Sequence, residues 1–249
     1  IKLELIGLAS FEKWVLPAEH AHMFPLLQRL TIRKCPRLLG LPFSNHIASP
    51  YWFPKLQHVD IQDCPEFSSV IPISWTGSVC SITMERVKLL EKFAYSVSSN
   101  GAQLYIIGND DLHSLDQVLL FDKEADLWEL SLRRCPPLEL KHLLMLTLLK
   151  TLIVRHSVAL VGQLGGQSDV EWQLHVEYIK IDDLTGNTGE ELTELLPHLP
   201  KLSKLEIRDC KNITQLVVGV DLQKTPSATS EMEEDEISTS KEEEDDAVL

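Results

Sequence analysis

The side chains of this chain that could do chemistry are few and widely spaced. Five cysteines occur, and four of them, Cys35, Cys64, Cys135 and Cys210, are separated by 29, 71 and 75 residues. These intervals match no zinc-ligand spacing. An odd number of cysteines at irregular spacing also does not predict the disulfide framework of a small secreted protein.

Two histidines, His20 and His22 in the segment EHAHM, have a spacing that binds metal in some strands. No cysteine or carboxylate set at ligand spacing accompanies them, so we interpret the segment as a polar loop and predict no metal site. The adjacent carboxylates Asp110–Asp111 and Asp182–Asp183 point apart on a strand or lie in turns. No Ser-His-Asp constellation occurs, and we expect that the chain is not an enzyme.

The glycine cluster GQLGGQSD at 162–169 has no Gly-Lys-Ser/Thr sequence that could hold phosphates and Mg²⁺. Gly165–Gly166 is therefore interpreted as a turn. We predict no cofactor within these 249 residues.

The four cysteines share a position in a repeated nine-residue frame, Leu-x-x-Leu-x-Ile-x-x-Cys. Degraded copies begin at Val79, Leu149 and Val176, and the segment AQLYIIGNDDL is the weakest match. Leu3, Leu5 and Leu8 resemble the end of a copy that lacks its first residues. The four clean copies are Leu27–Cys35, Leu56–Cys64, Leu127–Cys135 and Leu202–Cys210.

The spacing of about 22 to 29 residues between successive copies is typical of leucine-rich repeats. The central Leu-x-Ile alternates, so its two apolar side chains face one side of a short strand. We therefore predict an α/β fold, a horseshoe-shaped leucine-rich repeat solenoid of eight to nine irregular units. A parallel β-sheet would form its concave face, and irregular loops and short helices its convex face. The cysteines would turn inward as core residues.

Two regions differ in composition. Residues 1–220 carry the repeats, whereas residues 221–249 form an acidic tail that we expect to be disordered. From Lys224 to Leu249 the tail contributes −8 of the net charge of −14.

No apolar run approaches the roughly 20 residues that cross a bilayer, so no membrane span is predicted. Because the chain begins in mid-pattern, we expect it to be a fragment of a longer protein.

Two segments, FPLLQRLTIRKCPRLLGLP and FPKLQHVDIQDCPEF, resemble the leucine-rich repeats of plant intracellular immune receptors of the coiled-coil, nucleotide-binding type. The matching pairs include Phe24-Pro25, Phe53-Pro54 and Leu41-Pro42, together with Cys-Pro at Cys35, Cys64 and Cys135. The segment LPHLPKLSKLEIRDCKNITQL matches with Lys after its Cys. The resemblance covers residues 1–220, and the middle copies lack the Cys-Pro pair.

This resemblance implies a module of a disease resistance protein that recognises a pathogen effector or a guarded host protein and holds the receptor off at rest. A nucleotide-binding domain would precede the repeats and would be a partner within the receptor. The alternative is the substrate-binding repeats of an F-box ubiquitin-ligase adaptor. The absence of L-x-G-x-I-P repeats and of multiple sequons favours the cytoplasm or the nucleus.

The residues that alternate with the core leucines would project from the concave face and bind the partner. The arginines Arg133 and Arg155, with Arg134 and His156, are predicted to form a basic patch for an acidic protein surface. The alternative is a solvated face on which these charges pair with Glu129 and Asp182. Nucleic acid is not expected, because the chain is acidic. The candidate residues are Arg33, Lys34, Arg133, Arg134, Arg155, His156, Lys180, Lys204 and Arg208.

Overall fold

The structure is a computed structural model that describes residues 1–14, 24–41, 53–68, 79–118, 126–162, 172–186 and 188–216. The chain divides into two units, Ile1–Val218 and Gly219–Leu249, and every described residue belongs to the first. The predicted acidic tail, the pair His20 and His22, and Gly165–Gly166 all lie outside the described residues.

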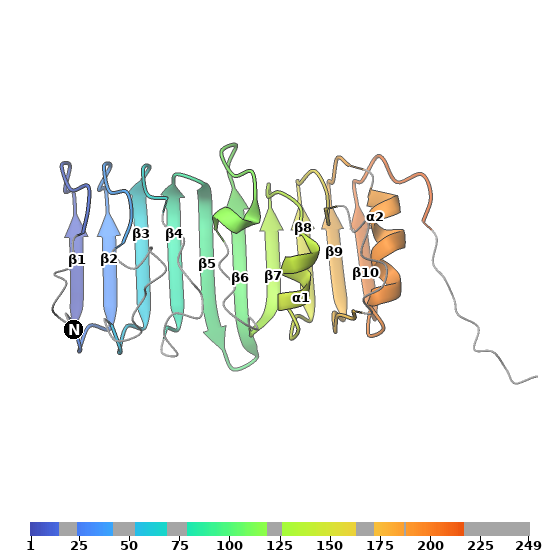
Figure 1. Ribbon diagram of the computed structural model, residues 1–249, viewed down its shortest axis with the longest axis horizontal. Coiled ribbons are helices and arrows are strands. Elements are labelled where there is room, and N and C mark those ends of the chain that lie inside the picture. Colours follow the sequence, from blue (N-terminus) through green and yellow to red (C-terminus); the bar gives the residue numbers. More distant parts are fainter. Residues whose placement is uncertain are drawn as a thin grey trace, which may run out of the picture. The chain divides into compact units, whose positions relative to one another are not determined.

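The described residues form one ten-stranded sheet in which the strands lie side by side in sequence order (Figure 1). Seven of its nine neighbouring pairs are parallel. A sheet that adds one strand after another in this way is a repeat solenoid, as predicted. The strands are β1 (Lys2–Ile6), β2 (Arg29–Arg33), β3 (His58–Cys64), β4 (Ser81–Val87), β5 (Leu90–Ser98), β6 (Gly101–Gly108), β7 (Leu127–Arg133), β8 (Thr151–Arg155), β9 (Tyr178–Asp182) and β10 (Lys204–Arg208).

The repeated frame builds the core. In β2, Leu30 and Ile32 are fully buried, and they pair in register with Val59 and Ile61 of the neighbouring strand β3. The degraded copies follow the same rule, since their frame residues from Val79, Leu149 and Val176 onward are also buried. All of these side chains belong to one apolar cluster on one face of the sheet. In these copies the frame therefore predicted both the strand and the side that each residue faces.

Short helical segments cover the core face. The described ones are η1 (Leu115–Gln117), α1 (Leu140–Met145), α2 (Thr188–Leu195) and η2 (Leu196–His198). Leu115, Leu143 and Leu192 are buried in the same apolar cluster as the frame residues of the strands. The opposite face of the sheet, which we call the polar face, carries the alternating residues.

The eighth residue of the frame has a left-handed backbone. Its φ lies between 48° and 57° at seven positions, none of them glycine. Each such residue costs about 1–2 kcal/mol in backbone strain. A recurrent hydrogen bond offsets the cost, because the N–H of Lys34, for example, donates to the Gln62 carbonyl at 3.0 Å. The seven residues are Lys34, Asp63, Arg86, Arg134, His156, Asp183 and Asp209.

The sheet is not parallel throughout, which corrects the prediction. Strand β5 runs antiparallel to both β4 and β6. After β4 the chain turns at Lys88–Leu89 and runs back as β5, the next strand of the sheet. It does not cross the core face before it forms this strand. A second turn at Ser99–Asn100 restores the original direction, so β6 is parallel to β7. Phe93 and Tyr95 of β5 are buried and add to the core.

The two edge strands bury their frame residues less completely than the central strands do. Leu3 and Leu5 of β1, and Leu205 and Ile207 of β10, are only partly buried against the core, whereas Leu130 of β7 is 0% exposed. A side chain on an end strand has a neighbouring strand on one side only. Identical frame positions therefore differ in their contribution to stability.

We expect Leu130→Ala to lower the free energy of unfolding by about 2–5 kcal/mol, as fully buried leucine truncations do. Leu205→Ala should cost clearly less, because water already reaches its side chain. Urea unfolding of both variants followed by circular dichroism checks this. Equal losses would mean that the edge strand is covered as fully as the centre.

Candidate recognition surface

The register of the strands arranges the polar face into three columns that cross the whole sheet. The column nearest the carboxyl ends of the parallel strands contains the seventh residue of each frame copy, in the order of the copies along the chain. The structure adds Ile6 before Arg33, and Lys92 and Ile107 between Glu85 and Arg133. That column reads Ile6, Arg33, Gln62, Glu85, Lys92, Ile107, Arg133, Arg155, Asp182 and Arg208.

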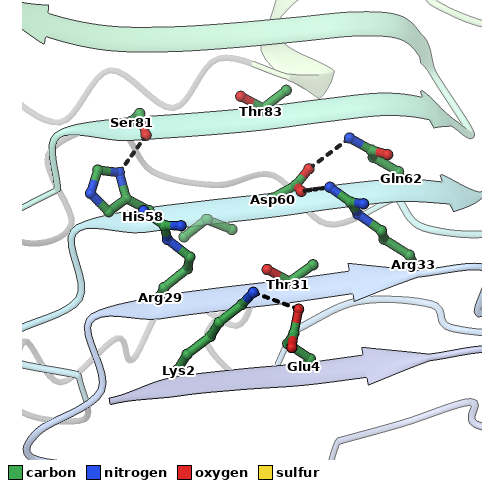
Figure 2. Close-up of a pocket in the computed structure, with 11 residues that line it drawn as sticks. Lys2, Glu4, Arg29, Thr31, Arg33, His58, Asp60, Gln62, Ser81 and Thr83 are labelled. Carbon is green, nitrogen blue, oxygen red and sulfur yellow. Dashed lines mark hydrogen bonds and ion pairs between the residues drawn. The ribbon is translucent and has the colours of Figure 1, made fainter.

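Over β1 to β4 the polar face holds a shallow, open depression of about 380 Å³ (Figure 2). Most of its charged groups are paired with one another, whereas Arg29 forms no ion pair among the described residues. Arg33 donates to Asp60 at 2.5 Å, and Gln62 donates to the other oxygen of the same carboxylate at 3.0 Å. His58 and Ser81 share a hydrogen bond of 2.8 Å between neighbouring strands. The predicted site residue Arg33 thus has its charge compensated within the sheet.

Over β9 and β10 the polar face is organised around one carboxylate. Glu206 contacts three predicted site residues, at 2.7 Å for Lys204, 3.4 Å for Arg208 and 3.5 Å for Lys180. The hydrogen bond from Lys204 is the main cause that lowers the pKa of the Glu206 carboxyl to about 2. Lys204 also lies 4.7 Å from the centre of the Tyr178 ring. These three cations are therefore held by internal contacts.

Between these two flanks, over β6 to β8, the polar face has a different character. Arg133 and Arg155 are register partners, as predicted, and within the described residues neither side chain forms an ion pair or a hydrogen bond. The predicted alternative pairs are not formed there. Glu129 instead accepts a hydrogen bond from Gln103 at 3.3 Å, and no ion pair joins Asp182 to Arg155, which lies opposite it.

Three apolar side chains share this central region. Tyr105 and Ile107 come from β6 and Ile153 from β8, and all three are half-buried on the polar face. The frame of the copy that begins at Leu149 places Ile153 on this face, whereas AQLYIIGNDDL matches the frame too poorly to place the other two. Continuing the alternation from Leu104 and Ile106 would have placed Tyr105 and Ile107 there.

The remaining predicted site residues lie in the left-handed turns that follow the strands. Lys34, Arg134 and His156 occupy the eighth frame position, with φ of 54°, 50° and 48°. His156 pairs with Asp183, the residue at the same position of the next copy, with 2.9 Å between Nδ1 and Oδ2. These side chains border the polar face at the ends of the strands and do not lie in its columns.

The frame cysteines have a structural role. The thiols of Cys64 and Cys135 each donate to the carbonyl two residues earlier, at 3.3 Å, which closes the end of the strand. Burial raises the pKa of both thiols to about 11, so they stay protonated near neutral pH. Ser157 takes the same position in the copy that begins at Leu149, and its hydroxyl donates to the Arg155 carbonyl at 3.1 Å.

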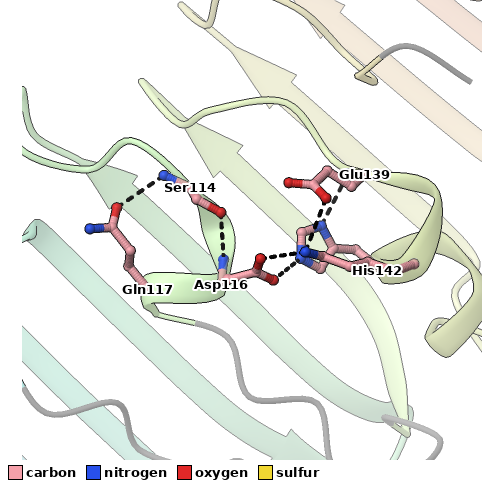
Figure 3. A network of polar contacts seen from close by, with 6 residues as sticks. Ser114, Asp116, Gln117, Glu139 and His142 are labelled. Carbon is pink, nitrogen blue, oxygen red and sulfur yellow. Dashed lines mark hydrogen bonds and ion pairs between the residues drawn. The ribbon is translucent and has the colours of Figure 1, made fainter.

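A histidine and an aspartate meet on the core face, a pairing that occurs in acid–base catalysis (Figure 3). The Nε2 of His142 lies 2.8 Å from an oxygen of Asp116. Its Nδ1 accepts the backbone N–H of Glu139 at 3.0 Å, at the start of α1. Both ring nitrogens of this buried histidine are therefore engaged. Because Asp116 belongs to η1 and His142 to α1, the contact joins these two helices. Lys141 also pairs with Asp116 and is the main cause that lowers the pKa of that carboxyl.

In the described ranges, no three histidine, cysteine or acidic side chains come together as a metal site would require. Nor does that part of the chain contain a helix long and apolar enough to cross a membrane. Comparison of the chain with models of protein families, with curated proteins and with solved structures finds no match.

The raised thiol pKa values predict a loss of stability at alkaline pH. The unfolded chain ionises these thiols near pH 9 and the folded chain only near pH 11, so the folded state binds more protons between these values. The free energy of unfolding should therefore fall as pH rises from 9 to 11, by at most about 1.4 kcal/mol per pH unit for each thiol. Urea titrations at several pH values measure it.

The control is the double variant Cys64→Ala/Cys135→Ala, in which the other titrating groups are retained. Its stability should decline less steeply over the same pH range. An identical slope in both proteins would show that these thiols do not contribute.

Proposed function

We propose that this chain is a leucine-rich repeat module that recognises proteins through its polar face. More specifically, it is the sensor and autoinhibitory region of a plant intracellular immune receptor with a nucleotide-binding domain. The polar face would be the concave face of the horseshoe, and its ligand a pathogen effector or a guarded host protein. The receptor would act in the cytoplasm or the nucleus.

The observation that carries the proposal is the alignment of the repeats. The residues that the copies share are buried, and those that they do not share form continuous columns on one face. A fold of this kind lets exposed residues vary without disturbing the core, which suits recognition. The Phe-Pro, Cys-Pro and Leu-Pro pairs support the assignment to immune receptors.

The irregularity of the sheet also distinguishes the proposal from the F-box alternative. The repeats of F-box adaptors are more regular in length, whereas this sheet includes the antiparallel strand β5 within its stack. The full transcript that encodes the chain provides the direct test. A phosphate-binding Gly-Lys-Ser/Thr region encoded before Ile1 supports the proposal, and an F-box of about 40 residues at that position contradicts it.

Reversing the charge of the central arginines should abolish recognition without unfolding the protein. We expect Arg133→Glu/Arg155→Glu to lose the proteins that the wild type labels in a proximity-biotinylation experiment in leaf cells. Forked hydrogen bonds to acidic groups require the guanidinium. Circular dichroism should be unchanged, because both side chains lie on the solvent side of the sheet.

The matched control is Arg37→Glu/Lys55→Glu, which makes the same change of net charge at two exposed positions outside the columns. This variant should keep the wild-type set of labelled proteins. If the Arg133→Glu/Arg155→Glu protein also keeps that set, the polar face is not the recognition surface.

A further inference from the structure

Two rows of three residues form a compact grid at the centre of the polar face, over β6, β7 and β8. One row contains Tyr105, Ser131 and Ile153, and the other Ile107, Arg133 and Arg155. Neighbouring strands lie about 4.8 Å apart, and two residues along a strand span about 6.6 Å. The grid is therefore about 10 Å by 7 Å, the footprint of one or two side chains of a partner.

The two arginines of the grid lack compensation on the protein itself. Elsewhere on the face most cations are held, such as Arg33 by Asp60 and Lys204 by Glu206, and Arg29 of β2 stands alone rather than beside a second unpaired arginine. Within the described residues, by contrast, Arg133 and Arg155 contact no carboxylate, although Arg155 lies opposite Asp182 in the register. The positive charge at the centre thus remains available to an incoming anion.

The Nε of Arg155 is buried and has no hydrogen-bond partner. Among the described residues it is the one buried side-chain nitrogen or oxygen atom in this state. Buried donors in folded proteins are nearly always satisfied, because an unpaired donor has lost its hydrogen bonds to water without gaining others. Rotation of this side chain toward a bound carboxylate would give Nε an acceptor. Binding an anion would thus relieve a cost that the free protein carries.

The apolar members of the grid define what must accompany the anion. Tyr105 and Ile153 lie on either side of Ser131, and Ile107 lies next to Arg133. These side chains are half-buried, and covering them removes more apolar surface from water. A phosphate of a nucleic acid would leave them uncovered, and the net charge of −14 repels a long polyanion.

We propose that this grid binds a protein segment in which an aspartate or glutamate lies within two residues of an aliphatic or aromatic side chain. The carboxylate accepts hydrogen bonds from Arg133 and Arg155, and the apolar side chain packs over Tyr105, Ile107 and Ile153. This inference rests on the proposed protein-recognition function and specifies the chemistry of the partner.

Selection of phage-displayed random 12-residue peptides on the immobilised 249-residue chain tests the proposal. The enriched peptides should share a carboxylate within two residues of Leu, Ile, Phe, Tyr or Trp. A consensus without a carboxylate, a consensus without an apolar residue, or no enrichment overturns it.

Fluorescence anisotropy with the most enriched peptide then separates the two components. Arg133→Glu/Arg155→Glu should weaken binding at least about tenfold, and Arg133→Lys/Arg155→Lys by an intermediate factor, because lysine lacks the forked donor geometry. Tyr105→Ser/Ile153→Ser should weaken it about fivefold while leaving the salt dependence unchanged. The Arg37→Glu/Lys55→Glu control should bind as the wild type does, and binding that none of these variants alters would place the peptide elsewhere.

The chain's own acidic segment is a competing occupant. A full-length variant in which the ten acidic residues after Lys224 become Asn or Gln should bind the peptide as tightly as the wild type. Markedly tighter binding would assign the grid to that segment and overturn the proposal of a separate partner. If the selection fails but cellular labelling is still lost in Arg133→Glu/Arg155→Glu, the partner chemistry is wrong and the recognition function stands.

Discussion

The in-register pairing of adjacent strands is the constraint on which the rest of the structure depends. Because side chains alternate in a strand, a slip of one residue would exchange the core face and the polar face. Leu30 opposite Val59, and Leu130 opposite Leu152, hold this register by burying their side chains in a common core. The same pairing aligns the residues between them, so the apolar frame determines which polar side chains become neighbours.

On the polar face, charge compensation varies along the sheet. At the flanks most cations have a carboxylate partner, as for Arg33 with Asp60 and Arg208 with Glu206, and Arg29 is an exception. Exposed ion pairs of this kind contribute little to stability, but they reduce the attraction of those cations for other anions. The central arginines keep their full attraction. A surface with many cations can therefore have one preferred place for an acidic ligand.

The frame predicted the core side chains, the strand order along most of the chain and the inward role of the cysteines, because each depends on local alternation and burial. Strand β5 was not predicted. A register shift between Leu90 and Lys92 interrupts its alternation, and the turn at Lys88–Leu89 contains neither glycine nor asparagine. That Arg133 and Arg155 form no ion pair with Glu129 or Asp182 could not be predicted either, because a side-chain contact depends on rotamers as well as on register.

The antiparallel strand β5 has a consequence for how such a chain can change in length. One reversal alone would leave every later strand pointing the opposite way. The left-handed turn that follows each of these strands would then lie at the opposite end of the strands. Two reversals cancel, and β6 resumes the polarity of β4. Insertions that keep an even number of reversals therefore widen the sheet by whole strands and leave the repeats on both sides unaltered. Whether an insertion contains an even or an odd number of reversals, more than how many residues it adds, would decide whether this architecture accepts it.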